Sequence, residues 1–195
     1  MVAGHSMGGM TVMAAAGRPA FREHTAAVLL CSTGSSRLVA ESTVVPIRAG
    51  RLRTWLTRQI LGARAPLGPV TPVARRILKY GTMGPGSAPH MVEACARIVH
   101  SCPRKVRYAW SQVLALLDLD HAVRELRVPT AVVVGTADRL SPPVHTRALA
   151  GALPNCVGVT ELPGVGHMSP VEAPELVSGR IRELVTTYAT IKEGA

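Results

Sequence analysis

The run Gly4-His5-Ser6-Met7-Gly8 constrains the fold of this chain more than any other part of its sequence. A serine between glycines at this spacing is typical of a sharp turn from a buried strand into a helix, and the strained turn aims the hydroxyl out of the sheet. Small residues two places before and after the serine avoid clashes with the adjacent strand and helix. Only Met1, Val2 and Ala3 precede the run. We therefore expect a very short first strand, followed by a helix over 7–17 that Gly17-Arg18-Pro19 ends.

The rest of the chain alternates short apolar runs with helical patterns, which predicts an α/β fold. Runs rich in Val and Leu predict buried strands over 26–33, 128–138 and 157–164. Helices are expected over 147–153 and 169–191, and the second begins with a Ser-x-x-Glu capping pattern. This order of elements indicates a mostly parallel sheet whose strands are linked by right-handed crossovers.

Residues 36–126 differ in character from the segments on either side. Arginines recur, Pro and Gly are dense, and short amphipathic stretches lie between the breaks. One such stretch, 51–61, has a helical spacing that gathers five residues on one face: Leu52, Trp55, Leu56, Gln59 and Ile60. We interpret 36–126 as a helical insertion between two parts of one core, 1–35 and 127–195.

The excess positive charge is confined to the middle of the chain. The 15 Lys/Arg and 5 Asp/Glu within 35–127 account for the whole formal net charge of +10. Such a surface either attracts anionic partners, including a weak contact with anionic membrane surfaces, or is a solvated region that tolerates arginine. The basic residues are dispersed and are not interleaved with aromatic side chains, so we expect no nucleic-acid partner.

The composition also argues against several classes of protein. A hydrophobic fraction of 47% and a mean hydropathy of +0.23 are untypical of disorder. No apolar run approaches the roughly 20 residues of a membrane-spanning helix. The four cysteines show no CxxC spacing and no phosphate-binding loop is present, so we expect no metal and no cofactor. No leader sequence is visible, which predicts a cytoplasmic location.

Two further polar residues follow predicted strands. Asp138 comes directly after the apolar run "AVVVGTA" of the strand segment 128–138, and His167 lies in a glycine-rich loop after the next strand. Their separation accommodates one helix and one strand, so both loops emerge at the carboxyl edge of a parallel sheet, where ligands of such sheets bind. His167 would then act as general base towards Ser6, while Asp138 fixes the imidazole tautomer. Taken singly, Asp138 could be a loop-capping carboxylate and His167 a surface histidine.

Two neighbours of Ser6 have different expected roles. The backbone N–H of Met7, at the start of the helix, would face the oxyanion of a tetrahedral intermediate, and the helix dipole would add to its stabilisation. His5 is the variable position of the turn, and we expect it to pack behind the turn without a catalytic role.

Three segments, "GHSMGG", "VPTAVVVGTADRLSPP" and "LPGVGHMSPVEAPELV", resemble the nucleophile, acid and histidine signatures of the α/β-hydrolase family. The resemblance is closest to lipases, esterases and related small-molecule hydrolases. It implies that Ser6, Asp138 and His167 form the triad, that Gly4 and Gly8 are the glycines of the nucleophile elbow, and that 36–126 is the cap inserted after the sixth strand. The family's sheet has about eight strands. This chain would retain a stub of the fifth strand and strands six to eight, a partial form of the fold.

The resemblance implies a cofactor-independent serine hydrolase that acts on small-molecule esters or related acyl bonds. The family's second oxyanion donor comes from a loop after the third strand, which has no counterpart in this sequence. We therefore expect a fragment of a longer enzyme, whose start was placed too late. The alternative is a non-catalytic remnant that is inactive or pairs its exposed strand edge with another chain.

Overall fold

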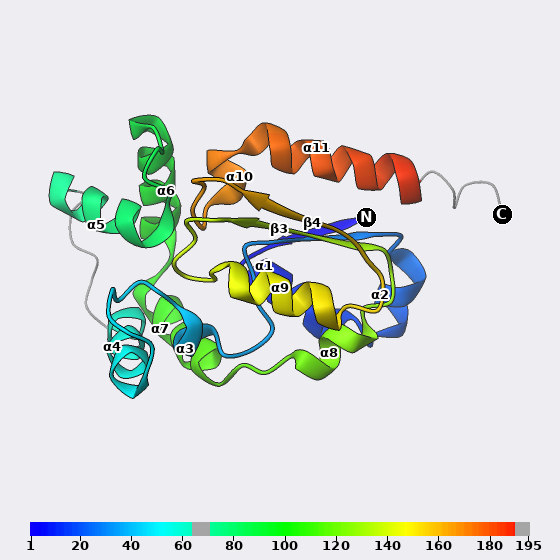
Figure 1. The fold of residues 1–195 in the computed structure, drawn as a ribbon, viewed down its shortest axis with the longest axis horizontal. Coiled ribbons are helices and arrows are strands. Elements are labelled where there is room, and N and C mark those ends of the chain that lie inside the picture. The colour runs from blue at the N-terminus through cyan, green and yellow to red at the C-terminus, as the bar shows by residue number, and fades with distance from the viewer. Residues whose placement is uncertain (64–70, 190–195) are drawn as a thin grey trace.

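The computed structural model describes residues 1–63 and 71–189, and these form a sheet with helices on both faces (Figure 1). Four parallel strands lie side by side in chain order: β1 (Val2–His5), β2 (Val28–Cys31), β3 (Thr130–Gly135) and β4 (Cys156–Leu162). All residues of β2 and β3 are buried, as is usual for parallel strands covered on both faces. The predicted α/β class and the parallel sheet are confirmed.

Alternate residues of the strands supply two separate cores. Leu30 and Val132 point to one face, where they pack with Met13 of α1 (Met7–Ala15) and Leu149 of α9 (Pro143–Ala152). The neighbouring residues of the same strands, such as Val133, point to the other face and pack against α11 (Pro174–Leu184). This period of two follows from the pleat of a strand. The sheet therefore lies between two layers of helices.

A helix that we did not predict lies between α1 and β2. The sequence Gly17-Arg18-Pro19 was expected only to end the first helix. The structure ends α1 at Ala15 and begins α2 (Pro19–His24) at the proline. Proline is favourable at the first helical position because its missing N–H would have no acceptor there. The same residue that ends one helix therefore starts the next.

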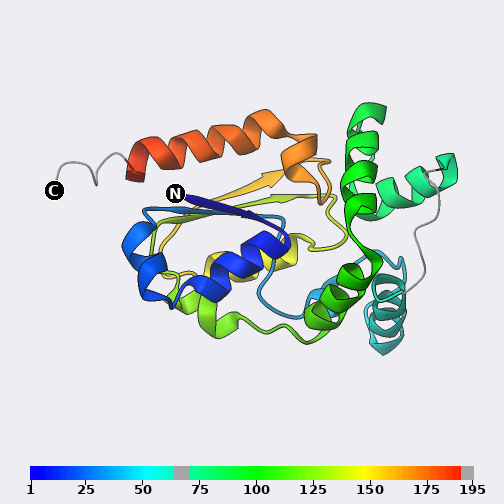
Figure 2. The same ribbon diagram turned by 180° about the vertical axis from the view of Figure 1, so that it is seen from behind.

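The predicted insertion is helical wherever the structure assigns regular elements to it. Its elements are α3 (Leu38–Glu41), α4 (Arg51–Leu61), α5 (Pro72–Thr82), α6 (Pro89–Ser101), α7 (Arg104–Leu116) and α8 (Asp120–Glu125). Figures 1 and 2 place α4 to α7 together beyond one end of the sheet. The last helix is different, since Val123 and Leu126 are buried in the core with Met13. The exact boundaries 36 and 126 remain a prediction.

Helix α4 turns three of its five large apolar residues towards solvent, and the other two, Leu56 and Leu61, are half-buried. Leu52, Trp55 and Ile60 are more than half exposed, whereas Arg53 and Thr57 are buried. The Arg53 guanidinium donates one hydrogen bond to the carbonyl oxygen of Ala40 at 2.8 Å, while its Nε is buried without a hydrogen-bond partner among the described residues. The apolar face seen in the sequence is therefore an exposed face of the insertion.

The C-terminal helix differs from its prediction. The expected single helix over 169–191 is divided into α10 (Ser169–Glu172), α11 and a π-helical turn at Val185–Ala189, and residues 190–191 lie outside the described residues. Pro174 disfavours helical backbone in the residue before it, which explains the break at Ala173. The capping pattern was also misread, because Ser169 does not cap the helix. Its hydroxyl instead lies 3.0 Å from the hydroxyl of Ser32.

Within 1–63 and 71–189, no helix is long and apolar enough to cross a membrane.

Candidate active site

Ser6 lies at the turn from β1 into α1 in a strained backbone conformation. Its φ and ψ are 51° and −118°, a region that costs a residue with a side chain about 1–3 kcal/mol. Two bonds hold it there. The Ser6 N–H donates to the carbonyl of Cys31 at 2.9 Å, and the Thr33 hydroxyl donates to the carbonyl of Ser6 at 2.8 Å. The end of β2 therefore helps to fix the turn that presents the Ser6 hydroxyl.

The prediction that small residues avoid clashes at this turn is confirmed at Gly4 and wrong at Gly8. A Cβ on Gly4 would lie 2.6 Å from the backbone nitrogen of Gly9, so a side chain has no room. A Cβ on Gly8 would meet nothing within 4 Å among the described residues. The crowded helix residue is Gly9, where a Cβ would lie 2.7 Å from Cγ2 of Thr33. The helix begins so sharply that Gly9 is the residue that faces the neighbouring strand end.

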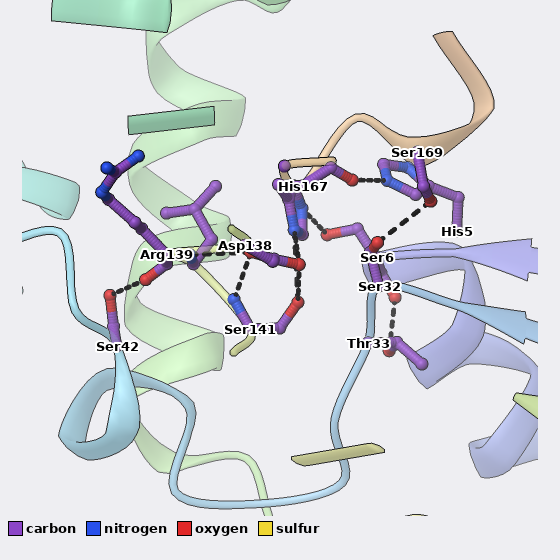
Figure 3. A network of polar contacts seen from close by, with 12 residues as sticks. His5, Ser6, Ser32, Thr33, Ser42, Asp138, Arg139, Ser141, His167 and Ser169 are labelled. Atoms are coloured by element: carbon purple, nitrogen blue, oxygen red, sulfur yellow. Dashed lines mark hydrogen bonds and ion pairs between the residues drawn. The ribbon is translucent and has the colours of Figure 1, made fainter. Parts of the chain in front are cut away.

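Ser6, His167 and Asp138 lie in one chain of hydrogen bonds (Figure 3). The Ser6 hydroxyl lies 3.0 Å from Nε2 of His167, and Nδ1 of the same ring lies 2.9 Å from Oδ2 of Asp138. The three residues follow the carboxyl ends of β1, β4 and β3, as the sequence predicted. In the productive tautomer the hydroxyl donates to Nε2, and Nδ1–H donates to the carboxylate. This arrangement can move a proton off the serine oxygen.

The Asp138 carboxylate is buried, with 2% exposure, and is surrounded by donors. Its Oδ1 accepts from the backbone N–H groups of Leu140 and Ser141, each at 2.9 Å. Its Oδ2 accepts from the Ser141 hydroxyl at 2.9 Å, in addition to the imidazole. That hydroxyl also lies 3.2 Å from Nδ1 of His167. Ser141 was missed in the sequence, although a serine three residues after an acidic loop residue was a readable signal for a local turn.

His5 contacts the site more directly than we expected. Its Nε2–H donates to the backbone carbonyl oxygen of His167 at 2.8 Å, and the two ring centroids are 5.0 Å apart. Burial, followed by the nearby His167 ring, lowers the pKa of His5. A neutral His5 therefore braces the backbone of the residue that contacts Ser6.

Met7 is the first residue of α1. The N–H groups of the first helical turn have no acceptor within the helix, so the Met7 amide is free to point towards a developing negative charge.

In the part of the chain that the structure describes, no group of three or more His, Cys, Asp or Glu residues could hold a metal ion. The cysteines are not in disulfides, and burial raises the pKa of Cys31 to about 12.

Comparisons with known proteins agree with this architecture. The model of the alpha/beta hydrolase family matches residues 1–180. The chain is similar to a thermophilic esterase from Thermogutta terrifontis, with 25% identity and a TM-score of 0.70 over 95% of this chain and 64% of that one. It is also similar to an enol-lactonase from Burkholderia xenovorans LB400, with 20% identity and a TM-score of 0.65 over 94% of this chain and 64% of that one.

A third similar structure is described as a putative lipase from Acinetobacter baumannii AYE. It is 20% identical, with a TM-score of 0.62 over 94% of this chain and 60% of the lipase. A search of curated protein sequences finds no significant match. The chain spans less than two thirds of the length of these three structures. Since the family model covers nearly the whole sequence and the fold agrees with it, the chain belongs to the α/β-hydrolase family.

Proposed function

We propose that the chain carries the catalytic triad of a serine hydrolase that acts on small-molecule esters or related acyl bonds. The observation that supports this most is the continuous hydrogen-bonded path from the Ser6 hydroxyl through His167 to Asp138, with distances of 3.0 and 2.9 Å. The esterase and enol-lactonase among its structural neighbours are consistent with an acyl substrate.

The proposed reaction follows from the roles of these side chains. Ser6 Oγ attacks the substrate carbonyl while its proton passes to Nε2 of His167. Asp138 holds the resulting imidazolium, and the Met7 N–H stabilises the oxyanion. The protonated His167 then gives its proton to the leaving group. Water, deprotonated by His167, releases the acid from the acyl-enzyme. The reaction needs no metal or cofactor.

We further propose that the chain works as part of a longer enzyme. It spans 64% of the esterase that it resembles, and a second oxyanion donor would come from outside the chain. Loss of one such donor reduces the rate by about 10²–10³-fold. The rival hypothesis is a remnant that binds another chain without catalysis. A folded but inert product that co-purifies with a partner would favour the remnant.

The test is labelling by a fluorophosphonate probe, together with hydrolysis of a short-chain aryl ester. We expect wild-type protein to be labelled and to hydrolyse the ester, and Ser6→Ala to lose both properties. Ser101→Ala, at an exposed serine that ends α6, is the matched control and should behave as wild type. Labelling that persists in Ser6→Ala would show that another residue is the nucleophile.

A second proposal concerns anionic membrane surfaces. The helices α4, α5 and α7 together contain nine Lys or Arg residues, all but Arg53 at least partly exposed, and no Asp or Glu. They also leave large apolar side chains exposed, with Trp55 at 56%, Ile77 at 67% and Leu116 at 81%. Basic residues beside exposed apolar ones are typical of helices that lie on anionic bilayers. Binding to vesicles with anionic lipid should weaken at high salt, and salt-independent binding would contradict this proposal.

A further inference from the structure

Glu172 joins the loop that carries His167 to the helical insertion. Its Oε2 accepts hydrogen bonds from the backbone N–H of Gly84 and from the hydroxyl of Ser87, both at 2.6 Å. The backbone N–H of Gly166 lies 3.1 Å from each of the two carboxylate oxygens. One carboxylate at the end of α10 therefore holds two segments that are about 80 residues apart in sequence.

The two segments are also joined through their backbones. The N–H groups of His167 and Met168 both donate to the carbonyl oxygen of Thr82, at 3.0 and 3.1 Å. The approach is so close that a Cβ on Gly84 would lie 1.9 Å from the carbonyl oxygen of Gly164. His167 is thus anchored to the insertion by its own amide as well as by its neighbours.

An apolar cluster lies beside these polar contacts. Met83, Val92 and Cys95 of the insertion are buried together, and Met168 and Val171 pack against them. The loop before α10 is therefore in contact with the insertion on one side and with the Ser6 hydroxyl on the other. Any change in its position moves the imidazole relative to Ser6.

We propose that Glu172 is a positioning residue that keeps Nε2 of His167 opposite the Ser6 hydroxyl by clamping the His167 loop to residues 84–87. This inference rests on the proposed function. Hydrogen bonds to a carboxylate are shorter and stronger than those between neutral groups, and the glycines at 164 and 166 give this part of the loop more conformational freedom than other residues would. A displacement of about 1 Å at a reacting group can reduce the rate about 10²-fold.

The test compares Glu172→Gln with Glu175→Gln. The first variant keeps the shape of the side chain, but when its amide oxygen takes the place of Oε2, its NH₂ group takes the place of Oε1 and faces the backbone N–H of Gly166. The second makes the same change of charge at an exposed residue three positions along the chain. We expect Glu172→Gln to lower kcat by about 10–10²-fold while KM changes less than about threefold. Glu175→Gln should have the same kcat and KM as wild type.

Two measurements distinguish positioning from a loss of folded protein. Fluorophosphonate labelling of Glu172→Gln should reach the same final extent as wild type, but at a lower rate, whereas misfolding would reduce the final extent. Ser87→Ala should lower kcat less than Glu172→Gln and should add nothing further in the double variant, because both changes open the same clamp. Additive losses, or an unchanged kcat in Glu172→Gln, would overturn the proposal.

Amide hydrogen exchange tests the clamp without relying on activity. Exchange in peptides covering 82–87 and 164–168 should be faster in Glu172→Gln than in wild type, and exchange in β3 should be unchanged. Equal exchange in Glu172→Gln and wild type would overturn the clamp proposal even if neither protein is active. Activity that survives Ser6→Ala, by contrast, would contradict the proposed function and leave the exchange result to decide on the clamp.

Discussion

Replacing Asp138 with asparagine should disable His167 by changing its tautomer. The asparagine side chain has one oxygen and one NH₂ group. The backbone N–H groups of Leu140 and Ser141 both point at Oδ1 and cannot turn away, so the amide oxygen must take that place. The NH₂ group then faces Nδ1 of His167. The imidazole must accept there, and its proton moves to Nε2, where it faces the Ser6 hydroxyl.

The expected loss is large because the wrong tautomer cannot take the serine proton. The corresponding change in a serine protease lowers kcat about 10⁴-fold, which is about 5 kcal/mol of transition-state stabilisation. The geometry here supports a similar magnitude, since the residue is 2% exposed and both groups that donate to Oδ1 are backbone amides. The protein should remain folded, because every donor that now faces Oδ1 keeps an acceptor.

The assay is kcat for a short-chain aryl ester at neutral pH, with circular dichroism to verify folding. Asp118→Asn is the matched control. Asp118 is exposed and accepts a hydrogen bond from the amide of Asp120, so its variant should keep kcat within about twofold of wild type. If Asp138→Asn retained more than about a tenth of wild-type kcat, the deduction that the two amides fix the orientation of the side chain would be wrong.

Three further predictions concern residues around the same turn and loops. Ser141→Ala removes a hydroxyl donor to the Asp138 carboxylate and should lower kcat/KM about tenfold. Gly4→Ala should reduce the free energy of unfolding in urea by about 1–3 kcal/mol because its Cβ would lie 2.6 Å from a backbone nitrogen. Gly8→Ala should be neutral or stabilising by up to about 1 kcal/mol, and an equal cost at both glycines would refute the steric assignment. Because burial lowers the pKa of His5 from 6.5, the unfolded chain binds a proton more readily, so stability should fall as pH decreases below about 6.5. Between about pH 7.5 and pH 5, the free energy of unfolding in urea should decrease less in His5→Gln than in wild type. An identical decrease in the two proteins would show that His5 does not cause the pH dependence.

The elements that the sequence predicted well are those whose local pattern and tertiary role agree. The strands β2 and β3 are continuous apolar runs because parallel strands between two helical layers are buried on both faces. The turn at Ser6 was predictable in part, because the small residue two places before the serine has a steric cause at Gly4, whereas Gly8 has none among the described residues. The placement of Asp138 and His167 at one sheet edge followed from strand order alone, because all carboxyl ends of a parallel sheet lie at the same edge.

The errors arose where a local pattern had more than one use. Ser169 and Glu172 matched a helix cap, but their side chains bond to Ser32 and to the loop at Gly84. The pattern could not reveal this, because both partners come from segments that are distant in the chain. The proline at position 19 was read as a helix stop, although the same ring is suited to a helix start.

The sequence by itself determined the class of fold, the succession of strands along the chain and the residues at the carboxyl ends of β1, β3 and β4. These depend on hydrophobic pattern and on turn chemistry, which are local and can be read from neighbouring residues. The tertiary structure alone decided which groups surround those residues, including Ser141 on the Asp138 carboxylate, His5 on the carbonyl of His167 and Glu172 on the insertion. Such contacts depend on how distant segments pack, and hydrogen bonds act only over about 3 Å. They therefore exist only once the chain has folded.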